Sequence, residues 1–177
     1  MEELDVYDIN RIKTGQIVKR GEKMPKGGYR LVVHIVILNE EGQMLIQQRT
    51  GFDNHKTRGF LNLWDITVGG SAVSNETSQQ AAHRELQEEI GYSYDFSSMR
   101  PQMTFNFPTG FDDYYVIHAH PDINALKLQK EEVQRVRWAG KEEIMKMIQD
   151  GSFVPYYPEI IALLFSAKTS YGCVTHE

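Results

Sequence analysis

The hydrophobic residues of this chain gather in short runs that have the length of β-strands. The most apolar run covers residues 29–38, and a second one follows at 44–49 after the turn residues of 39–42. Because apolar, β-branched runs bounded by turn signals are typical of buried strands, these two runs predict a hairpin. The same pattern predicts further strands at 64–68, 105–107, 114–120 and 133–138.

The first 28 residues are more polar and are rich in glycine and lysine. Within them, 5–7 and 16–18 flank a turn-like stretch, so residues 1–28 are predicted to form a small hairpin extension. No internal repeat or low-complexity linker divides the rest of the chain. A chain of this length is expected to fold as one unit, and we predict a single domain over residues 1–177.

Three segments have the pattern and the end signals of helices. The clearest covers 77–90, where Thr77 and Gln80 have the spacing of a capping box and Gly91 stands where a C-terminal cap belongs. Two further helices are predicted at 141–150 and at about 158–168. Because strands, a helix, more strands and two helices follow one another, the order favours an α/β fold with helices on the faces of a mixed sheet.

Composition narrows the classes of function. The 177 residues carry 19 Lys and Arg against 24 Asp and Glu, a net charge of −5, so no nucleic-acid partner is expected. The N-terminus lacks the apolar core of a signal peptide, and no apolar run approaches the ~20 residues of a membrane span. We therefore expect a cytoplasmic protein without membrane association. A single cysteine, Cys173, excludes an internal disulfide or a cysteine-rich zinc site.

The helix predicted over 77–90 carries a cluster of acidic residues. At 100° per residue, Glu85, Glu88 and Glu89 fall within an arc of about 100°. Beside this arc lies an apolar stripe of Ala82, Leu86 and Ile90. Like charges at this spacing repel by about 0.2–0.5 kcal/mol per pair, and a divalent cation would neutralise them. Carboxylate oxygens favour a hard ion such as Mg²⁺, Mn²⁺ or Ca²⁺ over zinc, and the alternative is a solvated acidic helix face.

The sequence around this cluster has a specific spacing. Residues 70–92 match the pattern G-x5-E-x7-R-E-U-x-E-E-x-G-U, where U is aliphatic, with Tyr92 in place of the last aliphatic residue. This segment resembles the Nudix box, the signature of the Nudix hydrolase family. The flanking strand pattern is also similar over roughly 29–165. The resemblance implies a Nudix-type α/β/α sandwich around a mixed β-sheet.

The resemblance also implies a reaction. It implies hydrolysis of a diphosphate linked to another moiety, with Mg²⁺ or Mn²⁺ as cofactor. The implied metal ligands are Glu85, Glu88, Glu89 and the backbone carbonyl of Gly70, and Glu88 or Glu89 is expected to help polarise the attacking water. Arg84 is expected to orient one of these glutamates. The expected partner is a small-molecule diphosphate, with a nucleotide-derived one as the first choice; a homodimer is left open.

Two residues outside the box complete the expected site, and a further acidic residue within the box is expected to be structural. Arg49 ends a predicted strand and is expected to bind a substrate phosphate, with an exposed strand-end arginine as the alternative. Glu132 precedes another strand and is expected to serve as a further ligand or base, the alternative being a solvated charge. Glu76 is expected to act on the helix dipole rather than in catalysis. The loops at 50–62 and 106–113 are expected to set substrate specificity.

Two other functions are weighed against hydrolysis. The extension and the approach to the box are similar to those of Nudix proteins related to type I isopentenyl-diphosphate isomerases. Such an isomerase needs a cysteine and a histidine where this chain has Gly69 and Ser71, so no isomerase activity is expected. A non-catalytic nucleotide-sensing module would not need to keep three ligands and Arg84. Nucleoside di- and triphosphates, nucleotide sugars and prenyl diphosphates all stay open as substrates.

Overall fold

The computed structural model of the chain describes residues 2–50, 59–167 and 172, so Cys173 and part of the predicted specificity loop 50–62 lie outside it. In chain order its elements are β1 (Glu3–Tyr7), β2 (Lys13–Lys19), β3 (Arg30–Leu38), β4 (Gln43–Arg49), β5 (Trp64–Asp65), β6 (Val68–Ser71), α1 (Ser78–Ile90), β7 (Met103–Phe107), β8 (Gly110–His118), β9 (Val133–Gly140), α2 (Lys141–Asp150) and α3 (Pro158–Ser166). Among the described residues, no helix is long and apolar enough to cross a membrane.

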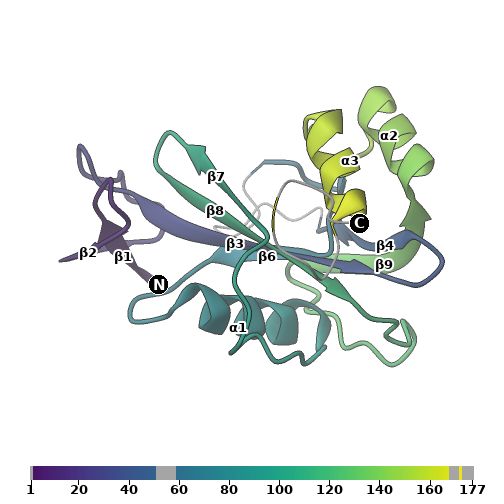
Figure 1. Cartoon of the computed structure of the whole chain (residues 1–177), viewed down its shortest axis with the longest axis horizontal. Coiled ribbons are helices and arrows are strands. Elements are labelled where there is room, and N and C mark those ends of the chain that lie inside the picture. The colour runs from purple at the N-terminus through teal and green to yellow at the C-terminus, as the bar shows by residue number, and fades with distance from the viewer. Residues whose placement is uncertain (1, 51–58, 168–171, 173–177) are drawn as a thin grey trace.

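A mixed sheet of seven strands forms the centre of the molecule (Figure 1). Strands β3 and β8 run parallel, from Arg30 opposite Gly110 to Leu38 opposite His118. Strands β3 and β4 pair only where Leu38 faces Met44. Beyond that point β6 lies beside β3, whereas β5 and β9 flank β4. The two strands therefore part, and we call this opening the fork of the sheet.

Thr67 explains why the strand predicted at 64–68 is divided. Its hydroxyl accepts a hydrogen bond from the backbone N–H of Ile37 in β3 (2.9 Å) and donates one to the carbonyl of Leu45 in β4 (2.5 Å). The side chain thereby bridges the two arms of the fork, with β5 on the β4 arm and β6 on the β3 arm. The prediction of one continuous strand is wrong because the chain crosses between arms at this residue.

Helices cover both faces of the sheet. Helix α1 lies on one face, where Leu86 and Ile90 are buried against Val33 and Ile35 of β3 (Figure 1). Helices α2 and α3 lie on the other face. The core on that side includes Val36, Met44, Ile46, Ile144 and Ile161. Full burial of each such side chain contributes about 1.5–3 kcal/mol, so the two layers hold the sheet firmly between them. The expected α/β/α sandwich is confirmed.

The predicted helix ends are confirmed where local signals mark them. The capping box is present, since Thr77 and Gln80 exchange hydrogen bonds between side chain and backbone N–H (2.8 and 3.2 Å). Gly91 caps the other end of α1 with a φ of 68°. Helix α3 ends at Ser166, and the predicted end at Lys168 lies outside the described residues.

The strand limits follow pairing more than local composition. Strand β8 begins at Gly110 rather than at the predicted residue 114, because its pairing with β3 starts there. Strand β9 continues to Gly140, which pairs with Gln43 of β4. Cross-strand partners thus extend both strands beyond the apolar runs that predicted them.

Strands β1 and β2 form the hairpin predicted within residues 1–28, and we call it the N-terminal hairpin. It is a separate two-stranded sheet at one end of the molecule (Figure 1). Leu4 and Val6 are buried under it, and Tyr7 and Tyr29 exchange two backbone hydrogen bonds (2.7 and 2.9 Å). The hairpin is therefore joined to the residue that precedes β3. A single domain over residues 1–177 stays a prediction.

Candidate active site

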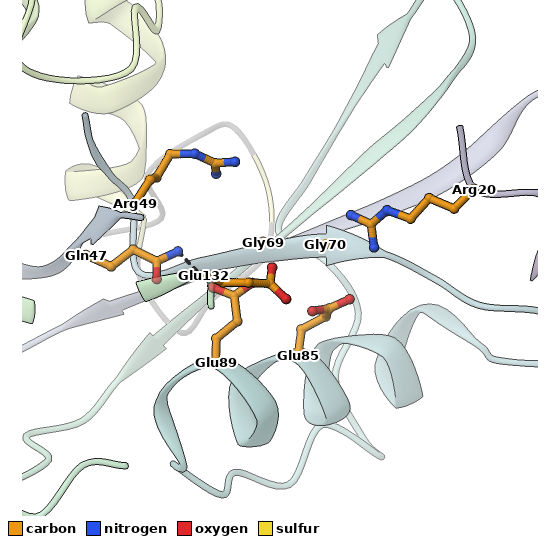
Figure 2. A pocket seen from close by; sticks show the side chains of 8 residues that line it. All are labelled: Arg20, Gln47, Arg49, Gly69, Gly70, Glu85, Glu89 and Glu132. Carbon is orange, nitrogen blue, oxygen red and sulfur yellow. Dashed lines mark hydrogen bonds between the residues drawn. The ribbon is translucent and has the colours of Figure 1, made fainter. Parts of the chain in front are cut away.

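A cavity beside α1 gathers charged side chains from distant parts of the chain (Figure 2). They come from the turn after β2, from β4, β6 and α1, and from the turn before β9. The lining residues are Arg20, Gln47, Arg49, Gly69, Gly70, Glu85, Glu89 and Glu132. Three carboxylates and two guanidiniums thus share one cavity at the fork of the sheet.

Glu85 and Glu89 lie one turn apart on the sheet side of α1. They are 5% and 3% exposed, which is rare for glutamates unless they are paired or hydrogen-bonded. Glu89 accepts a hydrogen bond from Nε2 of Gln47 in β4 (2.8 Å), and Glu85 accepts one from Nη1 of Arg84 (2.9 Å). Because burial makes an isolated negative charge unfavourable, this pair of carboxylates favours a cation or protons nearby.

The pKa values of the two glutamates reflect this environment. Burial raises the pKa of Glu85, while the positive charge of Arg84 opposes that rise. Burial also raises the pKa of Glu89 well above its usual range, and the negative charges of Glu85 and Glu132 raise it further. Without a cation, Glu89 therefore holds a proton more readily than an exposed glutamate does.

Arg84 connects the box residues to one another. Its Nε and Nη2 donate to the two carboxylate oxygens of Glu76 (2.6 and 2.9 Å). Its Nη1 donates to Glu85 (2.9 Å) and Glu88 (3.1 Å), and Nη2 also donates to the carbonyl of Ser71 (3.0 Å). Since the guanidinium is planar and its donors are fixed, it holds the Glu85 carboxylate in one orientation. The orienting role of Arg84 in catalysis stays a prediction.

Glu76 serves Arg84 and does not cap the helix. Both of its carboxylate oxygens accept hydrogen bonds from Arg84, and Oε2 also accepts one from the backbone N–H of Val73 (2.9 Å). The helix N-terminus is capped by Thr77 instead, and the first turn of α1 contains no acidic residue. Glu76 thus has an ion pair with Arg84 in addition to its place just before the helix, and its action on the helix dipole stays a prediction.

Gly70 is in direct contact with the Glu85 carboxylate. A Cβ added at Gly70 would stand 2.1 Å from Oε1 of Glu85, so no side chain fits there without moving that carboxylate. Gly70 pairs with Val33 in β3, which fixes its position in the sheet. The backbone of Gly70 and the carboxylate of Glu85 thus form one wall of the cavity.

The sequence of this chain matches a known protein family. The family model described as the NUDIX domain matches residues 28–164. The chain belongs to the Nudix family. An uncharacterised Nudix hydrolase of Listeria monocytogenes is 43% identical over 170 residues, which cover 96% of this chain and 97% of that protein.

Two further relatives show how far the similarity reaches. The crystal structure of a Deinococcus radiodurans protein, DR0079, superposes with a TM-score of 0.72 over 92% of this chain and 97% of its own, at 22% identity. An isopentenyl-diphosphate Delta-isomerase of Pectobacterium atrosepticum is 28% identical over 116 residues, 66% of this chain and 60% of that protein. The family match and the Listeria relative identify the protein as a Nudix pyrophosphohydrolase, and the DR0079 structure shows the same fold.

The Nudix family generally uses divalent metal ions, and the cavity fits such an ion in part. Glu85, Glu89 and Glu132 supply hard oxygen donors, and the absent side chain of Gly70 leaves its backbone open to the same space. Glu88 differs, since its side chain is exposed and points to Arg84 (3.1 Å). Within residues 2–50, 59–167 and 172, no three acidic, histidine or cysteine side chains already stand close enough to enclose an ion. Glu132 thus lines the same cavity as Glu85 and Glu89, whereas Glu88 lies outside that lining.

Three lining residues were not assigned to the site from the sequence, namely Gly69, Gln47 and Arg20. Gln47 is 3% exposed, and its Oε1 is buried without a hydrogen-bond partner among the described residues. A polar residue on the same side of β4 as the buried Leu45 is the signal that could have found it. Arg20 gives no such signal, because only the docking of the N-terminal hairpin brings it to the cavity. Arg49 was expected, and its Nη1 donates to Asp65 (3.1 Å).

Proposed function

We propose that this Nudix protein cleaves the phosphoanhydride bond of a nucleoside diphosphate linked to another moiety, or of a related organic diphosphate, with Mg²⁺ or Mn²⁺. The observation that supports the proposal is the meeting of Glu85, Glu89 and Glu132 with Arg49 in one cavity. Acidic groups there suit a divalent cation, and a guanidinium suits a phosphate. The choice of a nucleoside diphosphate rests on the family and not on a contact of the described residues.

Each residue receives a role in this proposal. Glu85, Glu89 and the carbonyl of Gly70 would hold the cation, with Glu88 joining them from the helix edge. A bound cation would neutralise the diphosphate and lower the pKa of a coordinated water. Glu132 enters the cavity from the other arm of the fork and would accept the proton of the attacking water.

The substrate's phosphate would be held on the β4 side of the cavity. Arg49 lies there with its Nε buried and without a hydrogen-bond partner among the described residues. The Nη1 atom donates to Asp65, and in this proposal the other donors of the guanidinium would contact the phosphate. The ion pair with Asp65 would hold the Arg49 side chain in position at the cavity.

Metal-dependent turnover tests the proposal directly. With Mg²⁺ or Mn²⁺, a panel of nucleotide sugars, nucleoside di- and triphosphates and prenyl diphosphates is expected to give at least one substrate cleaved between its phosphates. EDTA should abolish turnover and added metal should restore it, because the carboxylates alone cannot neutralise the diphosphate. Mass spectrometry of the products identifies the broken bond. Full turnover in EDTA, or none on the whole panel with metal, would refute the proposal.

Isomerisation of isopentenyl diphosphate is expected to be absent. A Cβ at Gly69 would stand 2.6 Å from Nδ1 of His34, so even the cysteine that this chemistry needs would not fit there without displacing that ring. Ser71, two residues on, is buried and cannot replace a histidine as an acid or base near neutral pH. Incubation of the protein with isopentenyl diphosphate and Mg²⁺ should give no dimethylallyl diphosphate. Interconversion that a Glu89→Gln change abolishes would show that this strand carries a different chemistry.

A further inference from the structure

We propose that Arg20 of the N-terminal hairpin binds the substrate's diphosphate from the side of the cavity opposite Arg49. The inference rests on the proposed function, because it assumes that a diphosphate occupies this cavity. Arg20 lines the cavity together with Gly70 and Glu85, although it lies outside the Nudix box and outside the match to the family model. In Figure 2 Arg20 lies to the right of the carboxylates with its guanidinium toward Glu85, and Arg49 lies to the upper left of them.

The charges around Arg20 favour an anionic ligand. Arg20 is 20% exposed at its side chain, and its Nη1 donates to Glu2 (2.5 Å). Burial is the main cause that lowers the pKa of Arg30, and the positive charge of Arg20 lowers it further. The two guanidiniums are therefore neighbours. The Nε of Arg30 is buried without a hydrogen-bond partner within the part of the chain that the structure describes. Arg30 does not line the cavity, so its guanidinium adds positive charge beside Arg20, and Arg20 is the one that can contact a phosphate there.

The base of the hairpin is fixed to the loop that follows Gly70. The carboxylate of Asp5 in β1 accepts hydrogen bonds from Oγ of Ser74 and from the backbone N–H of Asn75 (2.9 Å each). The same carboxylate pairs with Lys13 of β2 (2.7 Å). Ser74 and Asn75 belong to the box segment that leads from β6 to α1. The hairpin therefore keeps a constant position relative to Gly70 and the carboxylates.

The tip of the hairpin is held by a buried aspartate of the sheet. Arg11 donates two hydrogen bonds to Asp113 in β8 (3.1 and 2.7 Å), and the Asp113 side chain is 1% exposed. Asp113 also accepts from Oγ of Ser78, the first residue of α1, and from Oγ1 of Thr104 (2.7 and 2.6 Å). Because both ends of the hairpin are fixed, the backbone of Arg20 is already in place before a ligand arrives, and little conformational freedom is lost on binding.

Binding of a non-hydrolysable diphosphate tests this role without turnover. Calorimetry with methylenediphosphonate and Mg²⁺ should show that Arg20→Ala binds about 10–100-fold more weakly than wild type, the loss of one charge-assisted contact. The KM of the best substrate from the panel should rise by a similar factor. The kcat should change less than about threefold, because Arg20 holds the bound diphosphate equally before and during reaction.

Three variants separate ligand binding from support of the hairpin. Glu2→Gln removes the ion pair but keeps the guanidinium, so it should bind the diphosphonate within about twofold of wild type. Lys19→Ala removes a neighbouring exposed charge and should do the same. Arg20→Lys keeps the positive charge and loses the planar guanidinium, so its loss of affinity for the diphosphonate should be intermediate.

The outcomes distinguish the inference from the proposed function. Equal binding by Arg20→Ala and wild type, or equal losses in Arg20→Ala and Glu2→Gln, would overturn the role of Arg20 and leave hydrolysis intact. A wild-type protein that neither binds the diphosphonate nor cleaves any panel substrate would overturn the proposed function, and the role of Arg20 with it.

Discussion

Replacing Glu89 by Gln is expected to lower the rate at least about 100-fold while leaving the metal-free protein as stable as wild type or more so. Glu89 is buried, and burial together with the charges of Glu85 and Glu132 disfavours its ionised form. A glutamine keeps an oxygen for the hydrogen bond from Gln47 and removes the buried charge. One kcal/mol corresponds to about 2–4 °C in a chain of this size, so a rise of a few degrees at pH 8 is the expected scale.

The pH dependence of stability gives the sign of this effect. The folded-state pKa of Glu89 lies above the ordinary value of 4.5, so the folded protein binds the proton more tightly than the unfolded chain. Stability of the metal-free wild type should therefore fall as pH rises from about 4.5 through the raised pKa. Melting curves between pH 5 and pH 8 should show a smaller fall for Glu89→Gln.

The effect of Mg²⁺ on the melting temperature tests whether Glu89 binds the metal. Mg²⁺ should raise the melting temperature of wild type more than that of Glu89→Gln, because an ion that binds only the folded state stabilises it. Glu88→Gln is a matched change on the same helix at an exposed position, and it should alter metal-free stability little. If metal-free Glu89→Gln instead melts several degrees below wild type and keeps its activity, the acidic cluster is structural.

Replacing Arg84 by Gln is expected to lower both stability and rate. The change removes the ion pairs with Glu76 and Glu85 and leaves both carboxylates without their partner in a largely buried position. Loss of one member of a buried ion pair typically destabilises by about 3–5 kcal/mol, or roughly 6–20 °C at the melting temperature. Turnover should fall at least about 10-fold, as is typical when a group that orients a metal ligand is lost.

Arg137→Gln is the matched control for that change. Arg137 pairs with Glu143 at 2.6 Å, but both side chains are more than a third exposed. An exposed pair contributes about 0–1 kcal/mol, and the packing of the Arg137 guanidinium over the Trp64 ring (4.7 Å) about 0.5–1 kcal/mol. Stability should therefore fall less than in Arg84→Gln, and turnover should not change. Equal melting temperatures for Arg84→Gln and Arg137→Gln would contradict the anchoring role assigned to Arg84.

The acidic helix shows which parts of the site could be predicted from the sequence. Helix α1 was predicted nearly to the residue, because Thr77, Gln80 and Gly91 act locally. The split among the glutamates also follows from geometry. Measured from the centre of the apolar stripe, Glu89 lies about 60° away, Glu85 about 100° and Glu88 about 160°. The first two are accordingly buried and the third is exposed.

The rest of the cavity depends on contacts between distant segments. Glu132 and Arg49 were predicted only as individual candidates, and their convergence requires the pairing of β9 with β4. Gln47 becomes a site residue only because its side chain reaches Glu89 of α1, 42 residues away in the sequence. Arg20 reaches the cavity only because the hairpin docks on Ser74 and Asn75, and no residue near Arg20 in the sequence predicts that contact.

The fork of the sheet also determines when during folding the site can exist. One arm carries Gly70 and packs against α1, whereas the other carries Gln47 and Arg49. The contact between Gln47 and Glu89 spans 42 residues, and the parallel pairing of Arg30 with Gly110 joins segments still farther apart. Such non-local contacts form slowly. A partly folded chain with α1 already formed would present its carboxylates but no cavity, so recovered catalysis reports completed assembly and recovered helix content does not.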